Sequence, residues 1–314
     1  MKLLQAEPII SDLPIVDPGL VWGEGPGFPG LIKGGFMEYL IIGNGIAGVC
    51  AAETIRQFDA EGGITMVADE TFTPYSRPMI SMVLAGQVVS DQLPIRRRRF
   101  YEDLQITPVL GNRISAIDVD QKRVRIQSGT SLHFDRLLIA TGADPRPIKA
   151  DGMHLKNIFF MRTETHVRNM LAVIPKTKKA LVLGGGLVGF KAAYGLLQRG
   201  LDVTMLITSG YPLSMQVDQT AGKLILDELR ENGLKVRVGI SVEAFDRNAS
   251  VTGAHLSDGT RTSCDLILQI NTARPHPLMR PGIRHKTKSS CPVDSLNCPS
   301  VEFIVIFSAF HSTP

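Results

Sequence analysis

Short apolar runs alternate with glycine-rich turns and amphipathic stretches along most of the chain. Residues 39–42 are four apolar residues in a row, which is typical of a strand buried on both faces of a parallel sheet. Residues 43–48 follow with the spacing Gly-x-Gly-x-x-Gly, and an alanine-rich helical stretch comes next. A second apolar run, residues 64–68, ends at Asp69-Glu70. This pattern predicts a strand–turn–helix–strand unit.

The three glycines of this unit have distinct physical uses. Gly43 permits a tight turn, Gly45 lets a pyrophosphate approach the backbone, and Gly48 lets the helix pack close to the strand. The helix N-terminus faces the phosphates, and an acid about 20 residues further on holds the ribose, here Asp69-Glu70. The alternative is an ordinary tight turn. The strand before the motif and the helix after it favour a dinucleotide site.

The same arrangement recurs about 140 residues further along the chain. Residues 180–183 predict a strand, residues 184–189 repeat Gly-x-Gly-x-x-Gly, and a helix follows to about Gln198. Residues 202–207 predict the next strand. Because each unit is a phosphate cradle, the sequence predicts that the chain holds two dinucleotides.

The remaining pattern mixes hairpins, strands and one clear helix. Alternating apolar and polar residues over 111–134 predict antiparallel hairpins, and residues 219–232 predict an amphipathic helix. Further buried strands are expected at residues 137–142, 236–242, 253–256, 266–270 and 303–307.

Composition narrows the class of protein. The chain has 314 residues, 44% hydrophobic and 20% charged, which is typical of a globular protein of about two domains. A net charge of +4 is too small to indicate a nucleic-acid partner. No apolar run approaches the roughly 18 residues of a membrane helix. The four cysteines show neither Cys-x-x-Cys nor zinc spacing, so we expect no metal site and reduced thiols in a cytoplasmic protein.

Residues 1–36 differ from the rest of the chain. They contain glycine and proline in quick succession and show no clear hydrophobic period. Two interpretations stay open: a real, disordered extension, or translated sequence upstream of a natural start at Met37.

From residue 38 to about residue 274 the motifs resemble, in order, the FAD-dependent pyridine nucleotide-disulfide oxidoreductase superfamily. The most similar branch contains the rubredoxin and ferredoxin reductases and the flavin domain of NAD(P)H-nitrite reductase. Residues 43–48 resemble its FAD motif, residues 75–78 its flavin-proximal loop, residues 134–142 its second flavin motif and residues 184–189 its nicotinamide motif.

The resemblance implies an α/β fold of two doubly wound, Rossmann-like three-layer domains, with the NAD(P) domain inserted in the FAD domain. The expected FAD domain is 37–148, the NAD(P) domain 149–274, and 275–314 a degenerate remnant of the FAD domain, truncated at the C-terminus. The implied reaction passes a hydride from NAD(P)H to FAD and electrons on to a ferredoxin, a rubredoxin, a reductase subunit or a small acceptor.

The resemblance also assigns site residues. One catalytic candidate is Lys191, which stands where many members carry Glu near the nicotinamide. The cofactor-binding candidates are Gly43, Asn44, Gly45, Ile46, Ala47, Gly48, Asp69, Glu70, Arg77, Arg113, Ala140, Thr141, Gly142, Gly184, Gly185, Gly186, Leu187, Val188, Gly189 and Thr272.

Four departures from the family pattern bear on function. Ile207 replaces the acid that holds the adenosine ribose of the nicotinamide nucleotide, so neither NADH nor NADPH is favoured. Thr272 replaces a glycine, and no Gly-Asp follows residues 303–307. Met82 stands where thiol-dependent members carry cysteine, so thiol chemistry is not expected.

Two further interpretations therefore stay open: an inactive nucleotide-binding relic, or a subunit completed by a partner chain. The run Arg96–Arg99 is a candidate dock for an acidic redox partner, although such runs are usually a solvated face.

Overall fold

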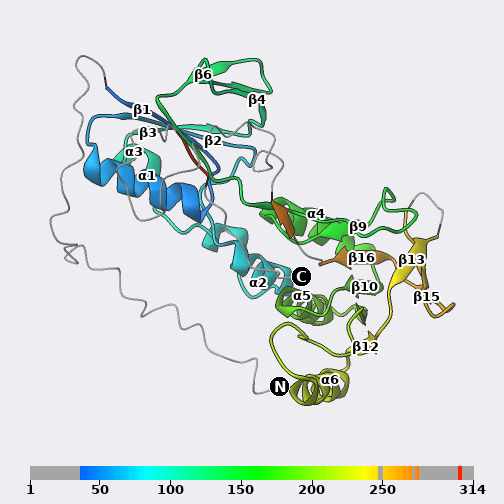
Figure 1. The fold of residues 1–314 in the computed structure, drawn as a ribbon. Coiled ribbons are helices and arrows are strands. Elements are labelled where there is room, and N and C mark those ends of the chain that lie inside the picture. The colour runs from blue at the N-terminus through cyan, green and yellow to red at the C-terminus, as the bar shows by residue number, and fades with distance from the viewer. Residues whose placement is uncertain (1–35, 247–249, 271–272, 276–302, 306–314) are drawn as a thin grey trace. The chain divides into compact units, whose positions relative to one another are not determined.

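The computed structural model describes residues 36–246, 250–270, 273–275 and 303–305, and Figure 1 shows their fold. The expected N-terminal extension, apart from Phe36, lies outside the described residues, and so does Thr272. Among the residues within these ranges, no helix is both long and apolar enough to cross a membrane.

The first sheet is built around the first glycine motif. Its five strands are all parallel, in the order β18-β7-β1-β2-β3. Their bounds are β1 (Glu38–Ile42), β2 (Gly63–Ala68), β3 (Ile106–Leu110), β7 (Arg136–Ile139) and β18 (Phe303–Val305).

Successive side chains of β1 supply both faces of this sheet. Ile41 packs with Val49 and Ala52 of helix α1 (Ile46–Phe58), whereas Leu40 and Ile42 face the opposite side. A small antiparallel sheet of β4 (Ile114–Asp118), β5 (Arg123–Ile126) and β6 (Ser131–His133) covers that side. Its pairing confirms the antiparallel hairpins predicted for this stretch. The result is three layers.

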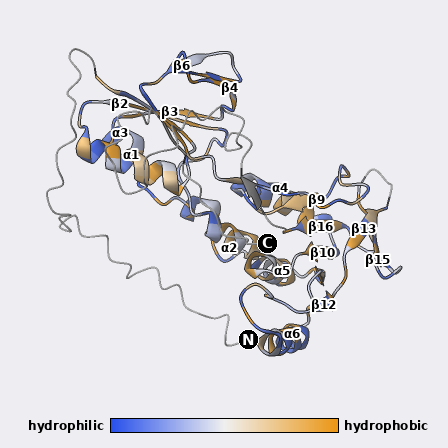
Figure 2. Ribbon diagram, viewed as in Figure 1, coloured by the Kyte–Doolittle hydropathy of each residue, from blue (hydrophilic) through white to orange (hydrophobic). Residues whose placement is uncertain are grey.

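The second sheet repeats this plan. Its five strands are also all parallel, in the order β12-β11-β10-β16-β9. Their bounds are β9 (Ile158–Phe160), β10 (Lys179–Leu183), β11 (Asp202–Ile207), β12 (Lys235–Val238) and β16 (Leu266–Gln269). In Figure 2 the strands of both sheets are largely hydrophobic, while α1 shows both hydrophobic and hydrophilic residues.

Helices cover one face of the second sheet and a small sheet covers the other. Val182 and Met205 pack against α4 (Glu164–Val173), α5 (Leu187–Gln198) and α6 (Gln219–Glu231). Leu181 and Leu206 pack against the antiparallel strands β13 (Val242–Phe245), β14 (Gly253–Leu256) and β15 (Arg261–Ser263).

Short elements connect these layers. They are the 3₁₀ turns Arg77–Met79, Ser90–Gln92 and Ile174–Lys176, the helices α2 (Ile80–Ala85) and α3 (Phe100–Asp103), and the paired strands β8 (Ala143–Pro145) and β17 (Ala273–Pro275). Helix α2 packs on α5 so closely that a Cβ on Gly195 would lie 3.2 Å from the backbone nitrogen of Ala85.

The structure confirms the predicted fold class, because β1 and β10 lie in separate doubly wound sheets. One predicted strand is wrong. Residues 236–242 do not form one strand but belong to β12 and β13, because Gly239 between them adopts a left-handed backbone with φ of +69°. The residue boundaries of the two domains stay predictions.

Candidate functional site

A cavity of about 930 Å³ opens at the carboxyl end of the first sheet. That edge is where open α/β sheets bind ligands, and the volume suits a large cofactor. The candidate residues that line the cavity are Gly43, Asn44, Gly45, Ile46, Ala47, Asp69, Glu70, Arg77, Arg113, Ala140, Thr141 and Gly142. The residues of the second glycine motif and Lys191 are not among its lining residues.

The first glycine loop has the geometry of a phosphate cradle. Gly43 has φ of +122°, and a Cβ there would lie 2.2 Å from the Ala140 carbonyl oxygen. A Cβ on Gly48, the one glycine of the motif that is not among the lining residues, would lie 2.0 Å from the Gly43 carbonyl oxygen. A Cβ on Gly45 would meet nothing within 4 Å, so this position is open. Gly45 also caps α1 without a side-chain bond, which leaves the helix N-terminus free for an anion.

Three side chains hold the loop that forms the next wall. The Tyr75 hydroxyl donates to Glu70 Oε2 at 2.6 Å, and Arg77 forms an ion pair with Glu70 Oε1. Burial, opposed by the charge of Arg77 and assisted by the bond to Glu70, raises the pKa of Tyr75 well above its usual value. Both oxygens of Glu70 are thus engaged within the protein.

The two predicted ribose acids therefore differ in what they offer a ligand. Asp69 is exposed and contacts only Arg113 Nη2, at 3.3 Å, among the residues that the structure describes. Its carboxylate retains free acceptor positions at the cavity edge, whereas Glu70 serves the loop. This distinction favours Asp69 over Glu70 as the ribose acid.

The sequence did not predict the wall that follows β9. Arg162, Thr163 and His166 line the cavity there. Arg162 Nε donates to the Ala143 carbonyl at 3.0 Å, and Arg77 Nη1 donates to the Arg162 carbonyl at 3.0 Å. Burial lowers the pKa of Arg162, and the neighbouring charge of Arg77 lowers it further. Thr163 followed by a helical stretch is an N-cap pattern, and it could have indicated from the sequence that a helix begins here.

His166 is held as a neutral side chain. Its Nδ1 accepts from the Arg162 backbone N–H at 3.3 Å, so the ring proton of the neutral form is on Nε2. Burial lowers the pKa of His166. The charge of Glu70 raises this pKa, and the charge of Arg77 lowers it.

Glu164 joins this wall to the loop before it. The carboxyl is 2% exposed, and its Oε1 accepts from Ser90 Oγ at 2.9 Å and Arg168 Nη2 at 3.0 Å. The Glu164 backbone N–H donates to the Tyr75 hydroxyl at 3.1 Å. The start of α4 is therefore fixed against the cavity wall.

These residues fit FAD. The glycine loop and uncapped helix suit its pyrophosphate, and Asp69 suits its adenosine ribose. The Thr141 hydroxyl is buried at the cavity and has no hydrogen-bond partner within the described ranges. Such a group needs a partner, which a polar ligand would supply.

The second glycine motif has the same backbone geometry as the first. Gly184 has φ of +125°, and a Cβ on Gly189 would lie 2.1 Å from the Gly184 carbonyl oxygen. Gly186 is open, and it caps α5 without a side-chain bond. The cradle therefore fits a second pyrophosphate. Leu187 and Val188, in the first turn of α5, are 57% and 45% exposed.

Lys191 lies in the second turn of α5 and is exposed. In the part of the chain that the structure describes, it forms no hydrogen bond or ion pair. The alternative interpretation, a helix residue paired locally, therefore has no support in the described residues.

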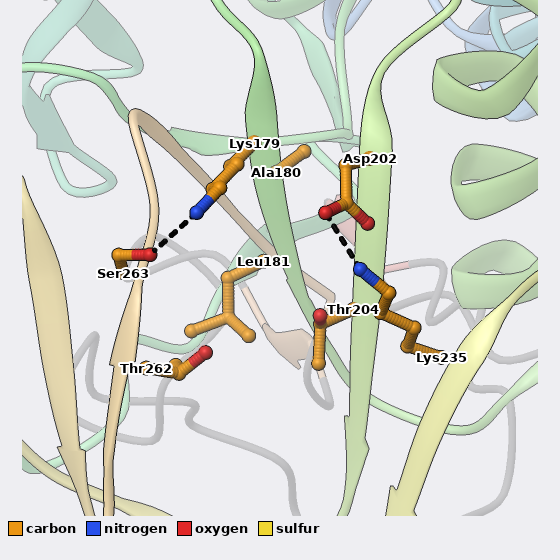
Figure 3. Close-up of a pocket in the computed structure, with 8 residues that line it drawn as sticks. All are labelled: Lys179, Ala180, Leu181, Asp202, Thr204, Lys235, Thr262 and Ser263. Carbon is orange, nitrogen blue, oxygen red and sulfur yellow. Dashed lines mark hydrogen bonds and ion pairs between the residues drawn. The ribbon is translucent and has the colours of Figure 1, made fainter.

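A smaller cavity of about 180 Å³ lies at the end of the second sheet where β10 begins, opposite the end that carries the second glycine motif (Figure 3). Lys179 Nζ donates to Ser263 Oγ at 3.0 Å, and Lys235 Nζ pairs with Asp202 Oδ2 at 2.6 Å. Dashed lines mark both contacts in Figure 3. Since Lys179 begins β10 and Gly184 follows its end, this cavity is roughly 16 Å from the glycine motif along the strand. It is not the dinucleotide site.

The arginine run is partly neutralised by acids. Arg96 forms a bidentate pair with Glu53 of α1, and Arg99 contacts Glu102 and Asp103. The other two arginines of the run, Arg97 and Arg98, have no acidic partner among the described residues, and a run that is half neutralised favours a solvated face over a dock.

The comparisons with known proteins agree with the geometry. Residues 37–304 match the family described as pyridine nucleotide-disulphide oxidoreductase. The chain is 32% identical over 234 residues to the 5,5'-dehydrodivanillate O-demethylase ferredoxin reductase subunit of Sphingobium sp., covering 74% of this chain and 57% of that protein. It is 29% identical to the rubredoxin-NAD(+) reductase of Pseudomonas putida, covering 74% of this chain and 61% of that protein.

Solved structures give the same result. The putidaredoxin reductase in a covalent complex with putidaredoxin superposes with a TM-score of 0.70 at 28% identity, over 76% of this chain and 58% of that chain. The chain thus spans less than two thirds of the length of these relatives. With a family match that extends over most of its residues, the chain belongs to the pyridine nucleotide-disulphide oxidoreductase family.

Proposed function

We propose that this protein is an NAD(P)H-dependent FAD oxidoreductase that passes a hydride from nicotinamide to flavin and electrons on to a redox protein or a small acceptor. The observation that carries the proposal is the pair of open glycine cradles, Gly43–Gly48 and Gly184–Gly189, on two separate parallel sheets. One cradle opens into a cavity large enough for a flavin nucleotide.

The chain's own residues bind and orient the flavin nucleotide. Backbone N–H groups at Gly45 and the start of α1 hold the pyrophosphate, and Asp69 accepts from the adenosine ribose. Half-buried Arg162 places a cation in the wall of the cavity that the Thr141 hydroxyl also lines, and we assign both groups to the flavin end. When bound, FAD supplies the redox chemistry, and the side chains of the protein tune it.

The second cradle holds the nicotinamide nucleotide. Gly186 lets the pyrophosphate approach, and the first turn of α5 at Leu187 and Val188 offers its backbone N–H groups. Thr272 stays a proposed contact from sequence alone. We assign Lys191 to the nicotinamide end, since its ammonium is exposed, with no partner in the described residues, one turn beyond the phosphates.

Relatives named as reductases of rubredoxin and of a demethylase system support a protein acceptor. We propose a ferredoxin, a rubredoxin or a partner subunit in that role. A cytoplasmic location accords with the free thiols of Cys50 and Cys264.

The test begins with the purified full chain. Reconstitution with FAD should give a protein-bound flavin spectrum, and anaerobic addition of NADH or NADPH should bleach it. Gly45→Val should abolish flavin binding, and Gly186→Val should abolish bleaching by the nucleotide while leaving the flavin bound. A protein that binds flavin but is never bleached by either nucleotide is not an NAD(P)H oxidoreductase.

Lys191 is tested with Lys191→Met and Lys191→Arg. If the ammonium acts at the nicotinamide end, Lys191→Met should slow bleaching and Lys191→Arg should restore part of the rate, with unchanged flavin binding. Equal bleaching rates in all three proteins would remove the role.

A further inference from the structure

The described residues 207–217, which end β11 and follow it beside the second glycine motif, include no charged side chain. The inference drawn from this rests on the proposed role of that motif as the nicotinamide nucleotide site. In such sites a carboxylate at the end of the second strand binds the ribose 2′-hydroxyl of NAD, whereas arginine receives the 2′-phosphate of NADP. Residues 207–217 of this chain read Ile-Thr-Ser-Gly-Tyr-Pro-Leu-Ser-Met-Gln-Val. Neither kind of recognition group is present.

Ile207 occupies the place of the acid and is fixed there. It is the last residue of β11 and is 1% exposed. A Cβ built on Gly185 would lie 2.6 Å from Ile207 Cγ2, so the side chain packs directly beneath the glycine loop. An apolar group therefore faces the backbone beside which the ribose of a bound dinucleotide lies.

The loop after β11 folds back onto the glycine motif. The Leu213 N–H donates to the Gly185 carbonyl at 3.0 Å, and the Gly239 N–H donates to the Ser209 carbonyl at 3.0 Å. The Ser209 hydroxyl donates to the Tyr211 carbonyl at 2.8 Å, so its proton is already used. Thr208 is exposed and offers the ligand a neutral hydroxyl.

Two charged groups on the adjoining elements are engaged elsewhere. Arg237 of β12 binds Asp258 and Thr260. Asp218, at the end of the loop, accepts from the Ala221 N–H at 2.8 Å and so caps α6. Apolar side chains are also exposed near the motif: Met215 of the loop is 71% exposed, and Leu187 and Val188, which follow Gly186, are 57% and 45% exposed. The other exposed side chains of the loop, Ser214 and Gln216, are neutral.

We infer that Ile207 makes this site indifferent to the 2′ substituent, so that it binds the hydroxyl form and the phosphate form of the nicotinamide nucleotide with matched affinity. Affinity comes from the backbone cradle and from apolar contact, both of which the two nucleotides share. A charge-assisted bond to only one nucleotide would separate them by about tenfold or more, and the described residues 207–217 supply none.

The experiment is a calorimetric titration of the FAD-loaded full chain with NAD⁺ and, separately, NADP⁺, so that no hydride transfer contributes to the heat. The expected dissociation constants agree within about threefold, and a difference of about tenfold in either direction would overturn the inference. If neither nucleotide binds, and Gly186→Val behaves as the unaltered chain does, the proposed nicotinamide site itself is wrong and the inference fails with it.

Variants test whether the missing charge is the reason. Thr208→Arg should tighten NADP⁺ about tenfold with NAD⁺ nearly unchanged, and Thr208→Glu should weaken NADP⁺ to a similar extent. Thr130→Arg and Thr130→Glu, at an exposed position of the hairpins on the first sheet, are matched controls for net charge and should leave both constants unchanged. Ile207→Glu should favour NAD⁺.

Because Ile207 is buried, circular dichroism checks that Ile207→Glu is folded. If Ile207→Glu does not fold, Thr208→Arg and Thr208→Glu alone test the inference. Equal responses of the Thr208 and Thr130 variants would show that residues 207–208 do not face the 2′ position, and would overturn the inference.

Discussion

His166 shows how one half-buried side chain ties stability to pH. Burial lowers the pKa of this imidazole below its ordinary 6.5, and the Arg162 backbone N–H holds Nδ1 in the acceptor form. Below about pH 6.5 the unfolded chain takes up a proton that the folded chain resists, so the folded state loses stability as pH falls. The neutral ring contributes its full stability above that pH.

We therefore predict that His166→Gln flattens the pH dependence of the free energy of unfolding between about pH 7.5 and 5.5, where one histidine contributes at most about 1.4 kcal/mol per pH unit. Urea unfolding at several pH values measures it. His133→Gln, an exposed histidine on β6, is the control for loss of an imidazole. Identical slopes for the unaltered chain and His166→Gln would contradict the prediction.

At the scale of the element, the glycines at the start of α1 have two different roles: Gly48 is needed for folding, whereas Gly45 is open to a ligand. A Cβ on Gly48 would collide with the Gly43 carbonyl oxygen, whereas Gly45 is open and has an extended backbone that valine tolerates. Gly48→Val should destabilise the protein by about 3 kcal/mol. Gly45→Val should change the free energy of unfolding of flavin-free protein by less than about 0.5 kcal/mol, yet prevent flavin binding.

Thermal unfolding of the flavin-free proteins, together with a flavin titration, separates these two effects. If Gly45→Val unfolds the protein as severely as Gly48→Val, the loop is closed rather than open and its role as a cradle is wrong.

The pair between Arg96 and Glu53 joins the loop after residue 95 to α1. Both side chains are about one third exposed, and the pair is bidentate, so we expect it to contribute about 1 kcal/mol, which salt reduces. Arg96→Gln should therefore lower the free energy of unfolding by about that amount, whereas Arg98→Gln should not. Urea unfolding at low salt measures both. Equal stability of the two variants would make Arg96 part of a solvated face.

Patterns read from the sequence predicted the elements with the strongest local signals. The apolar runs of β1, β10 and β11 and both glycine turns were predicted because a buried parallel strand and a phosphate cradle restrict residue type at each position. The segment after residue 236 was misread because an apolar run does not reveal that Gly239 turns the chain.

The cavity wall formed by Arg162 and His166 was missed for a different reason. These residues come from a segment almost 90 residues beyond the loop that they meet, as the bond between Arg77 and Arg162 shows. Only the packing of distant segments makes them part of the site. The same packing distinguishes Asp69 from Glu70, which neighbour each other in sequence and have different partners.

At the scale of the whole molecule, flavin affinity depends on how completely the first sheet surrounds its ligand. The sequence after β18 lacks the Gly-Asp that follows this strand in the family, and those residues lie outside the described ranges. Losing one or two charge-assisted bonds, each worth roughly 1.5–3 kcal/mol, predicts a flavin affinity one to several decades below that of ferredoxin reductases that carry the motif. A flavin fluorescence titration measures it. Stoichiometric flavin that survives prolonged dialysis would contradict it.

The pairing of β18 with β7 has a consequence for how the chain is made. Phe303 pairs with Leu137, so the two strands of this ladder are 166 positions apart in the sequence, and the second sheet and its covering layers lie between them. At 5–20 residues per second, a ribosome needs roughly 8–30 s to supply β18 after β7 has emerged. Throughout that interval β7 is an unpaired edge strand, open to pairing with another nascent chain. The first sheet therefore begins to form first and is completed last, with one edge of β7 unpaired until β18 is made.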